Sequence, residues 1–168
     1  FDALIFLTGV GVRALVTAVE RANQRDHFLE ALRRVRVIVR GPKPTAVLRE
    51  LDVPIWAGAP EPNTWRELVA TLDDRAGEWS LSGQRVAVQE YGASNPELLS
   101  ALAARGAAVT PVQAYRWAMP EDLEPLREAA RAIARGEVQV MLVTTGVQVT
   151  HLWQVVVAMG LEGDVRRG

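Results

Sequence analysis

Short apolar runs rich in β-branched residues alternate with segments of helical periodicity, and this alternation restricts the fold more than any other feature of the chain. Strands are predicted over residues 4–7, 35–39, 85–89, 109–115 and 138–143, with a brief strand at 54–56. Helices are predicted over residues 10–22, 27–34, 45–51, 64–72, 96–105, 120–135 and 147–159. Strands that alternate with helices pair in parallel through crossover connections, so we expect a doubly wound α/β sheet.

Local signals predict where several of the helices begin and end. Asn95 followed by Pro96 is typical of an N-cap with proline at the first helical position, and Gly106 of a helix end. Asp26 and Asn63 are predicted as N-caps of two further helices. Residues 41–44, Gly-Pro-Lys-Pro, predict a stiff loop before the next helix.

One nine-residue pattern occurs twice, as LTGVGVRAL over residues 7–15 and as TTGVQVTHL over residues 144–152. Both copies contain Thr-Gly-Val, a second valine and a final leucine, and both follow an apolar run. Only the second copy lies beyond residue 120. The chain is therefore expected to leave one α/β domain near residues 115–120 and to enter another of the same plan.

A strand that ends in Thr-Gly and continues into a helix is suited to binding an anion. The first turn of the helix has backbone N–H groups without intrahelical partners, and glycine lets a ligand approach them. The threonine hydroxyl can bond a ligand or simply cap the helix, and capping alone explains a single copy. Two copies favour a pair of anion-binding helix starts, both at the carboxyl ends of strands, where α/β sheets bind their ligands.

The composition excludes several classes of site. The chain has 19 basic and 20 acidic residues, so no overall field attracts nucleic acid or an anionic membrane. It has no cysteine and only two histidines, His27 and His151, so no metal site is expected. No apolar run reaches the length of a membrane helix, and we expect a cytoplasmic protein. The sequence opens on FDALIFL, directly at the first predicted strand and without an initiator methionine, which suggests a piece of a longer protein.

The order of five segments resembles the uroporphyrinogen-III synthase family. These segments are LIFLTGVGVRAL, RGPKPTAVLREL, RVAVQEYG, NPELLSALAARGAAVTPVQAYRW and GEVQVMLVTTGVQVTHL, and together they extend over nearly the whole chain. The resemblance implies two similar flavodoxin-like domains, each a doubly wound parallel sheet, joined by a two-stranded linker. Residues 1–113 would be the inserted domain without its start, residues 114–119 the linker, and residues 120–168 an incomplete part of the other domain.

The resemblance also implies a reaction. Enzymes of this family close the linear tetrapyrrole hydroxymethylbilane into uroporphyrinogen III, with inversion of ring D and loss of water, in tetrapyrrole and haem biosynthesis. They use no metal and no cofactor. The substrate carries acetate and propionate groups on its rings, and a protein that binds this polyanion through backbone amides needs no net positive charge. We expect the protein to be a monomer.

Family positions carry over to ten residues of this chain. Tyr115 matches the tyrosine that is the family's candidate catalytic group, although a tyrosine at a strand end can also simply pack its ring. The implied substrate-binding residues are Thr8, Gly9, Gly41, Lys43, Thr45, Gly92, Thr144, Thr145 and Gly146. Lys43 can meet a carboxylate or remain solvated.

Three residues depart from the family pattern and leave an alternative open. Leu7 replaces a hydroxyl residue, and Pro44 replaces a threonine. Glu90 lies in a segment where other branches carry an Arg-Gly pair; Gly92 matches the glycine, but the arginine is absent. We expect the Glu90 carboxylate to point away from a polyanionic ligand. The alternative function is a non-catalytic module that senses a tetrapyrrole or another anion and is fused to a regulatory domain.

Overall fold

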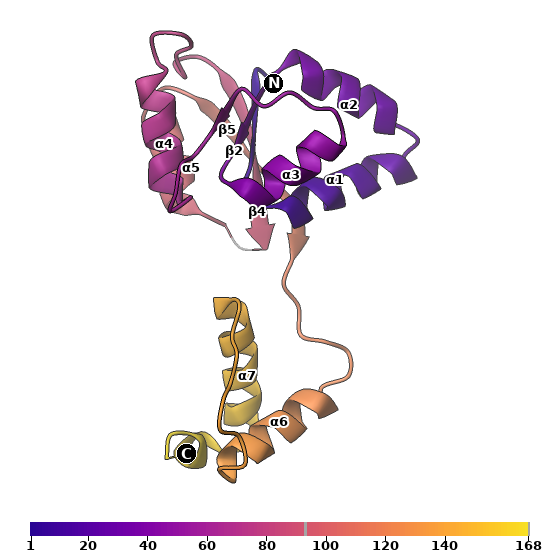
Figure 1. The fold of residues 1–168 in the computed structure, drawn as a ribbon, viewed down its shortest axis with the longest axis vertical. Helices are drawn as coiled ribbons and strands as arrows, with labels where there is room; N and C mark the ends of the chain where they lie inside the picture. The colour runs from indigo at the N-terminus through magenta and orange to yellow at the C-terminus, as the bar shows by residue number, and fades with distance from the viewer. Residues whose placement is uncertain (93, 168) are drawn as a thin grey trace. The chain divides into compact units, whose positions relative to one another are not determined.

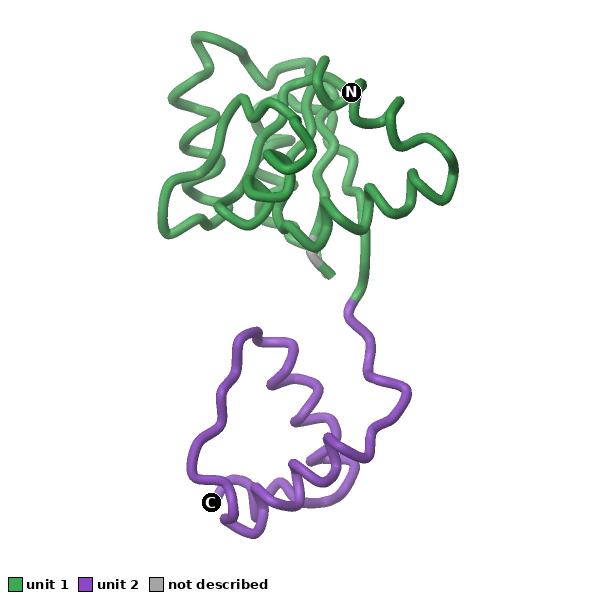
Figure 2. The backbone as a smooth tube through the Cα atoms, turned by 45° about the vertical axis from the view of Figure 1, so that its right-hand side comes forward, with its two compact units in different colours: residues 1–116 green, residues 117–168 purple. Residues whose placement is uncertain are grey.

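The computed structural model describes residues 1–92 and 94–167 and divides the chain into two compact units, Phe1–Arg116 and Trp117–Gly168 (Figure 2). Gly168, the last residue of the predicted second domain, lies outside the described residues. The division falls within the predicted linker of residues 114–119. The first unit's last strand continues to Arg116 and so includes the first half of that segment.

The first unit contains a parallel sheet of five strands in the order β3-β2-β1-β4-β5. The strands are β1 (Ala3–Phe6), β2 (Arg36–Val39), β3 (Ala57–Gly58), β4 (Arg85–Gly92) and β5 (Ala108–Arg116). The prediction of a parallel α/β sheet is confirmed for this unit.

The resemblance implied flavodoxin-like domains, and the strand order of this sheet differs from that of flavodoxin-like sheets. In flavodoxin-like sheets one strand lies on the far side of the first strand, whereas here β2 and β3 both lie there. The reason is local hydrogen bonding. The N–H groups of Trp56 and Ala59 donate to the carbonyls of Val37 and Val39, at 2.8 and 3.0 Å, so the segment after α3 joins the edge of β2.

Helices cover both faces of the sheet (Figure 1). On one face lie α1 (Gly9–Arg21), α2 (Arg25–Arg34) and α3 (Pro42–Glu50), and on the other α4 (Trp65–Asp74) and α5 (Pro96–Ala103). Alternate residues of one strand face opposite helical layers: Phe6 packs in the core beneath α1 to α3, and Ile5 in the core beneath α4 and α5. Both cores are buried, as a parallel sheet requires.

The helix start predicted at Asn95 is confirmed, whereas the loop predicted over residues 41–44 is wrong. The side-chain oxygen of Asn95 accepts the N–H of Leu98 at 3.1 Å, and Pro96 is the first helical residue. Helix α3 begins at Pro42, with Gly41 as N-cap. Proline has no N–H to lose at the first helical position, so the segment continues directly into a helix.

The two other predicted N-caps are displaced along the chain. Thr64, not Asn63, caps α4, and Glu67 accepts the Thr64 N–H at 2.9 Å to complete a capping box. Asn63 has a positive φ of 58° and precedes the helix. Gln24 is the N-cap residue of α2, and Asp26 lies in its first turn, where its charge favours the helix start.

The second unit consists of helices and irregular chain in its described residues. It contains α6 (Glu124–Ala134), α7 (Gly146–Ala158) and α8 (Glu162–Val165), which pack around Ala130, Val155 and Val156. The helices predicted over residues 120–135 and 147–159 are present, with α6 beginning later. No helix in the described ranges is both long and apolar enough to cross a bilayer.

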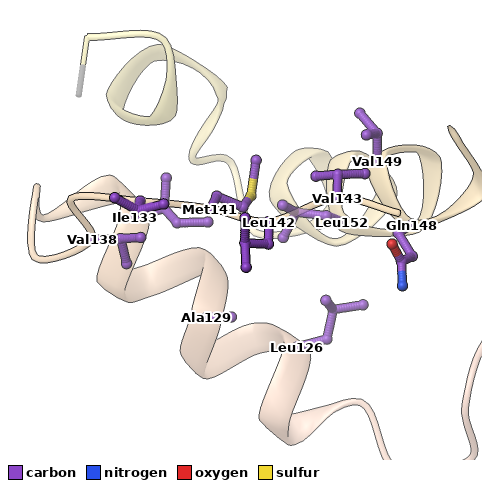
Figure 3. A pocket seen from close by; sticks show the side chains of 11 residues that line it. Leu126, Ala129, Ile133, Val138, Met141, Leu142, Val143, Gln148, Val149 and Leu152 are labelled. Carbon is purple, nitrogen blue, oxygen red and sulfur yellow. The ribbon is translucent and has the colours of Figure 1, made fainter. Parts of the chain in front are cut away.

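The strand predicted over residues 138–143 is wrong for this chain. The segment is irregular, and Val140 and Leu142 are 77% and 89% exposed. Together with α6 and α7 it lines an apolar groove; Figure 3 shows Val138 beside Ile133 at one end of the groove, and Met141 and Leu142 towards Leu152. A strand needs a neighbour for its backbone groups, and this unit has no other strand among the residues described.

An ion pair between α4 and the end of α5 gives a testable pH dependence. Arg105 donates to Asp73 through Nε at 2.5 Å and Nη2 at 2.6 Å, and this hydrogen bonding lowers the pKa of Asp73 below its usual value. A lowered pKa in the folded state stabilises the fold above the unfolded-state pKa, and the contribution is lost as the pH falls through the folded-state pKa.

We expect Arg105→Ala to lower the free energy of unfolding by at most about 1 kcal/mol at neutral pH, because the pair is partly exposed. The difference from wild type should shrink at a pH below the folded-state pKa of Asp73, to what the hydrogen bond from Arg105 to the Ala101 carbonyl contributes at any pH. Urea unfolding at the two pH values measures it, with Asp74→Asn on the same helix as control. An unchanged difference in acid would show that the ion pair contributes nothing and that Arg105 acts through its hydrogen bond to Ala101 or its packing.

Candidate functional site at the carboxyl edge of the sheet

The candidate site lies where the strand order reverses direction. The chain passes from β1 to β2 on one side, and β4 lies on the other side of β1. In open α/β sheets the ligand crevice is found outside the carboxyl ends of the strands at such a switch point. Thr8 follows β1, and Gln89 to Gly92 form the end of β4, so these residues meet there.

Thr8 and Tyr115 are brought together at this edge although 107 positions separate them. Thr8 is the N-cap of α1, and its Oγ1 accepts the N–H of Gly11 at 3.0 Å. The same hydroxyl lies 3.5 Å from the hydroxyl of Tyr115, near the end of β5. One oxygen thus caps α1 and lies beside the Tyr115 hydroxyl.

Gln89, which is not among the site residues predicted from the sequence, organises the start of α1. Its side chain is 1% exposed, its Oε1 accepts the N–H of Thr8 at 3.2 Å, and its Nε2 donates to the carbonyl of Glu90. A Cβ at Gly11 would lie 2.0 Å from the Gln89 amide nitrogen, so only glycine leaves room for it. The available signal was a buried polar residue near the end of an apolar strand.

Two backbone amides at this helix start remain free. Within the described residues, the N–H groups of Gly9 and Val10 donate to no protein acceptor. Val10 is 63% exposed, whereas Gly9 is buried against the start of α3, and both amides lie at the positive end of the α1 dipole. Such a pair can bind a carboxylate or phosphate oxygen without a basic side chain.

The start of α3 lies against the start of α1. A Cβ at Gly9 would be 2.9 Å from the carbonyl oxygen of Lys43, so these two helix starts touch through their backbones. The Lys43 side chain is exposed, while the Thr45 hydroxyl donates to the carbonyl of Gly41 at 2.8 Å. The structure therefore brings Gly41, Lys43 and Thr45 to the same edge as Thr8, with the Thr45 hydroxyl proton already engaged.

Gly92 and Glu90 have different roles at the end of β4. Gly92 has a φ of 59°, pairs with Arg116 and follows an irregularity in the β4–β5 register. Glu90 is 5% exposed and accepts hydrogen bonds from the Ser94 hydroxyl at 2.8 Å and the Asn95 N–H at 3.1 Å. These partners lie at the start of α5, so the carboxylate faces away from Thr8, in agreement with the expectation.

The other two departures from the family pattern also serve the packing of the first unit. Leu7 is 1% exposed in the core beneath α4 and α5, and Pro44 is buried in the first turn of α3.

The second Thr-Gly copy also forms a helix start, in the second unit. Thr145 is the N-cap of α7, and Gly146 is its first residue. The side-chain oxygen of Gln148 accepts the N–H of Thr144 at 2.9 Å, the hydroxyl of Thr144 at 3.2 Å and the N–H of Thr145 at 3.3 Å. All four residues are exposed, and no atom lies within 4 Å of a Cβ built on Gly146.

No group of three or more metal-ligating side chains gathers in the ranges that the structure describes. His27 is exposed on α2, and His151 is half-buried on α7.

Comparison with known proteins gives the family. A sequence model of the family described as uroporphyrinogen-III synthase HemD matches residues 1–166. The chain belongs to the uroporphyrinogen-III synthase family. Two structures titled uroporphyrinogen III synthase from Thermus thermophilus are similar to it. The first has a TM-score of 0.61 and is 30% identical, and the match covers 92% of this chain and 56% of the other. The second has a TM-score of 0.68 and is 28% identical, and the match covers 98% of this chain and 60% of the other.

A curated relative is also similar over almost all of the chain. It is described as uncharacterized protein YjjA of Bacillus subtilis (strain 168) and is 31% identical over 166 residues, which make up 99% of this chain and 59% of the relative. The family member described here thus spans about three fifths of the length of the curated relative that it matches.

Proposed function

We propose that the protein containing this chain is a uroporphyrinogen-III synthase that cyclises hydroxymethylbilane, with inversion of ring D and loss of water. The observation that carries the proposal is the pairing of the Thr8 and Tyr115 hydroxyls at 3.5 Å beside free backbone amides, in a chain of this family. These groups combine an anion-binding helix start with a phenol, the two functions that closure of a polycarboxylate substrate with loss of water requires.

Binding uses backbone donors in this proposal. The free amides of Gly9 and Val10 take one carboxylate arm of the substrate, and the Lys43 ammonium meets a second. The start of α7, with Thr144, Thr145 and Gly146, takes another arm in the same way. The near-neutral chain, with a net charge of −1, suits this mode because amides and helix dipoles supply the positive potential.

Tyr115 acts on the leaving group. At neutral pH a phenol donates a hydrogen bond, and a donor aimed at the hydroxymethyl oxygen helps water leave. The Thr8 hydroxyl is positioned to hold the phenol, because its own place is fixed by Gly11 and Gln89. Gly92 and the start of α3, with Gly41 and Thr45, complete the rim of the site. No metal or cofactor takes part in this mechanism, and the enzyme works as a cytoplasmic monomer.

Residues 120–168 are proposed to be part of a second α/β domain. The exposed apolar segment 138–143 supports this assignment, because its residues have the composition of a buried strand and already line one side of α6 and α7. The matched relative is longer than this chain and has room for the strands that would pair with it.

A coupled assay tests the function. Freshly made hydroxymethylbilane is supplied to the full-length protein, and the isomers are separated after oxidation of the product to porphyrin. We expect the type III isomer, formed faster than spontaneous closure and unaffected by a chelator. Formation of only the type I isomer at the spontaneous rate would overturn the proposal, and saturable binding without conversion would favour a sensor.

A further inference from the structure

A glutamine oxygen occupies the same place at both Thr-Gly helix starts, but the glutamines come from different positions in the sequence. At α1 the Gln89 oxygen, from β4, accepts the Thr8 N–H at 3.2 Å. At α7 the Gln148 oxygen, from the helix itself, accepts the Thr145 N–H at 3.3 Å. In the repeated pattern Gln148 aligns with Gly11, the residue whose missing side chain admits Gln89. The contact is therefore kept although the residue at the repeat position has changed.

A third helix start in the same chain uses a carboxylate for this purpose. At α4 the Glu67 carboxylate accepts the N–H of Thr64 at 2.9 Å, and the hydroxyl of Thr64 also bonds to it and lowers its pKa. Glutamate and glutamine both complete a capping box, and the negative charge of glutamate adds a favourable interaction with the helix dipole. Both Thr-Gly helix starts thus use glutamine, the neutral alternative, although glutamate would also complete the cap.

We propose that Gln89 and Gln148 are specificity-determining positioning residues, which fix Thr8 and Thr145 while keeping both helix starts free of negative charge for an anionic arm of the ligand. The inference rests on the proposed function for the identity of that ligand. A carboxylate at either position would keep the cap but repel the bound arm, since the two anions would share one helix start.

The two positions differ in how sharply they can be tested. Gln89 is 1% exposed and also donates to the Glu90 carbonyl, so Gln89→Glu loses a buried hydrogen bond as well as gaining charge. Gln148 is exposed and only accepts hydrogen bonds from Thr144 and Thr145. Gln148→Glu therefore preserves these three hydrogen bonds and changes only the charge of the side chain.

The experiment compares Gln148→Glu with Gln154→Glu in the full-length protein. Gln154 is exposed on the same helix, so its substitution adds the same charge away from the helix start. We measure the Kd for uroporphyrin III, a stable oxidised form of the proposed product, by fluorescence, and the KM for hydroxymethylbilane in the coupled assay. Thermal unfolding reports whether the cap is kept.

For Gln148→Glu we expect about a fivefold to tenfold rise in Kd and KM at low salt, larger than any change in kcat, with unfolding at or above the wild-type temperature. The rise should shrink as salt is added, because the site is exposed. Gln154→Glu should leave Kd and KM within twofold of wild type. A purely structural glutamine predicts no rise, and that result, or an equal rise in both variants, would overturn the inference.

The two readouts separate this inference from the proposed function. If wild type binds uroporphyrin III without cyclising hydroxymethylbilane, the synthase proposal fails, and the Kd comparison still decides the role of Gln148. If wild type binds no uroporphyrin III, the inference is overturned as well.

Discussion

Replacing Tyr115 by phenylalanine is expected to lower kcat for hydroxymethylbilane by about 10²-fold or more, the usual effect of losing a positioned proton donor. The substitution removes only the hydroxyl that lies 3.5 Å from Thr8 Oγ1 and keeps the half-buried ring. KM should change little, because the proposed carboxylate contacts are made by other residues. Initial rates and isomer analysis of the full-length variant provide the measurement.

Two controls make the Tyr115→Phe result specific. The free energy of unfolding should fall by about 1 kcal/mol or less, which is the net worth of one hydrogen bond. Thr8→Ser keeps the hydroxyl that caps α1 and should retain most of the activity. If the Tyr115→Phe variant had the kcat of wild type, Tyr115 would have no role in the reaction.

The second large effect is expected from Gly11→Ala, through stability. The added Cβ would lie 2.0 Å from the buried Gln89 amide, so the side chain or the start of α1 must shift, at a cost of about 1–3 kcal/mol. The shift also removes the acceptor of the Thr8 N–H and should reduce activity further. Chemical denaturation and the coupled assay measure the two effects.

A double variant identifies the cause of the Gly11→Ala loss. Gln89→Ala removes the side chain that the new methyl group would meet, so the double variant should be more stable than the sum of the single effects predicts. Gly77→Ala is the matched control, because no atom lies within 4 Å of its Cβ, and it should stay within about 0.5 kcal/mol of wild type. Strict additivity of Gly11→Ala and Gln89→Ala would contradict the clash.

Features that depend on nearby residues were predictable from the sequence. Strands β1, β2, β4 and β5 follow from short β-branched runs, and the start of α5 follows from Asn95 and Pro96, whose cap lies within one turn. The brief strand predicted over residues 54–56 is displaced, because β3 lies at Ala57–Gly58. The start of α3 was not predicted, because Pro42 was interpreted as part of a loop rather than as the first residue of a helix.

Features that depend on distant partners were not predictable in this way. The place of β3 at the sheet edge depends on hydrogen bonds to β2, and Gln89 reaches Thr8 across 81 positions. Residues 138–143 have the composition of a strand but no strand beside them in the described part of the second unit. For the candidate site, the repeated Thr-Gly pattern indicated both helix starts, whereas the second shared feature, the glutamine cap, is visible only in three dimensions.

The most direct test of the account is a crystal structure of the full-length protein with uroporphyrinogen III bound. We predict that one carboxylate arm accepts hydrogen bonds from the free amides of Gly9 and Val10, and that another lies at the start of α7 beside Gly146. Carboxylate arms that all lie away from both Thr-Gly helix starts would contradict it.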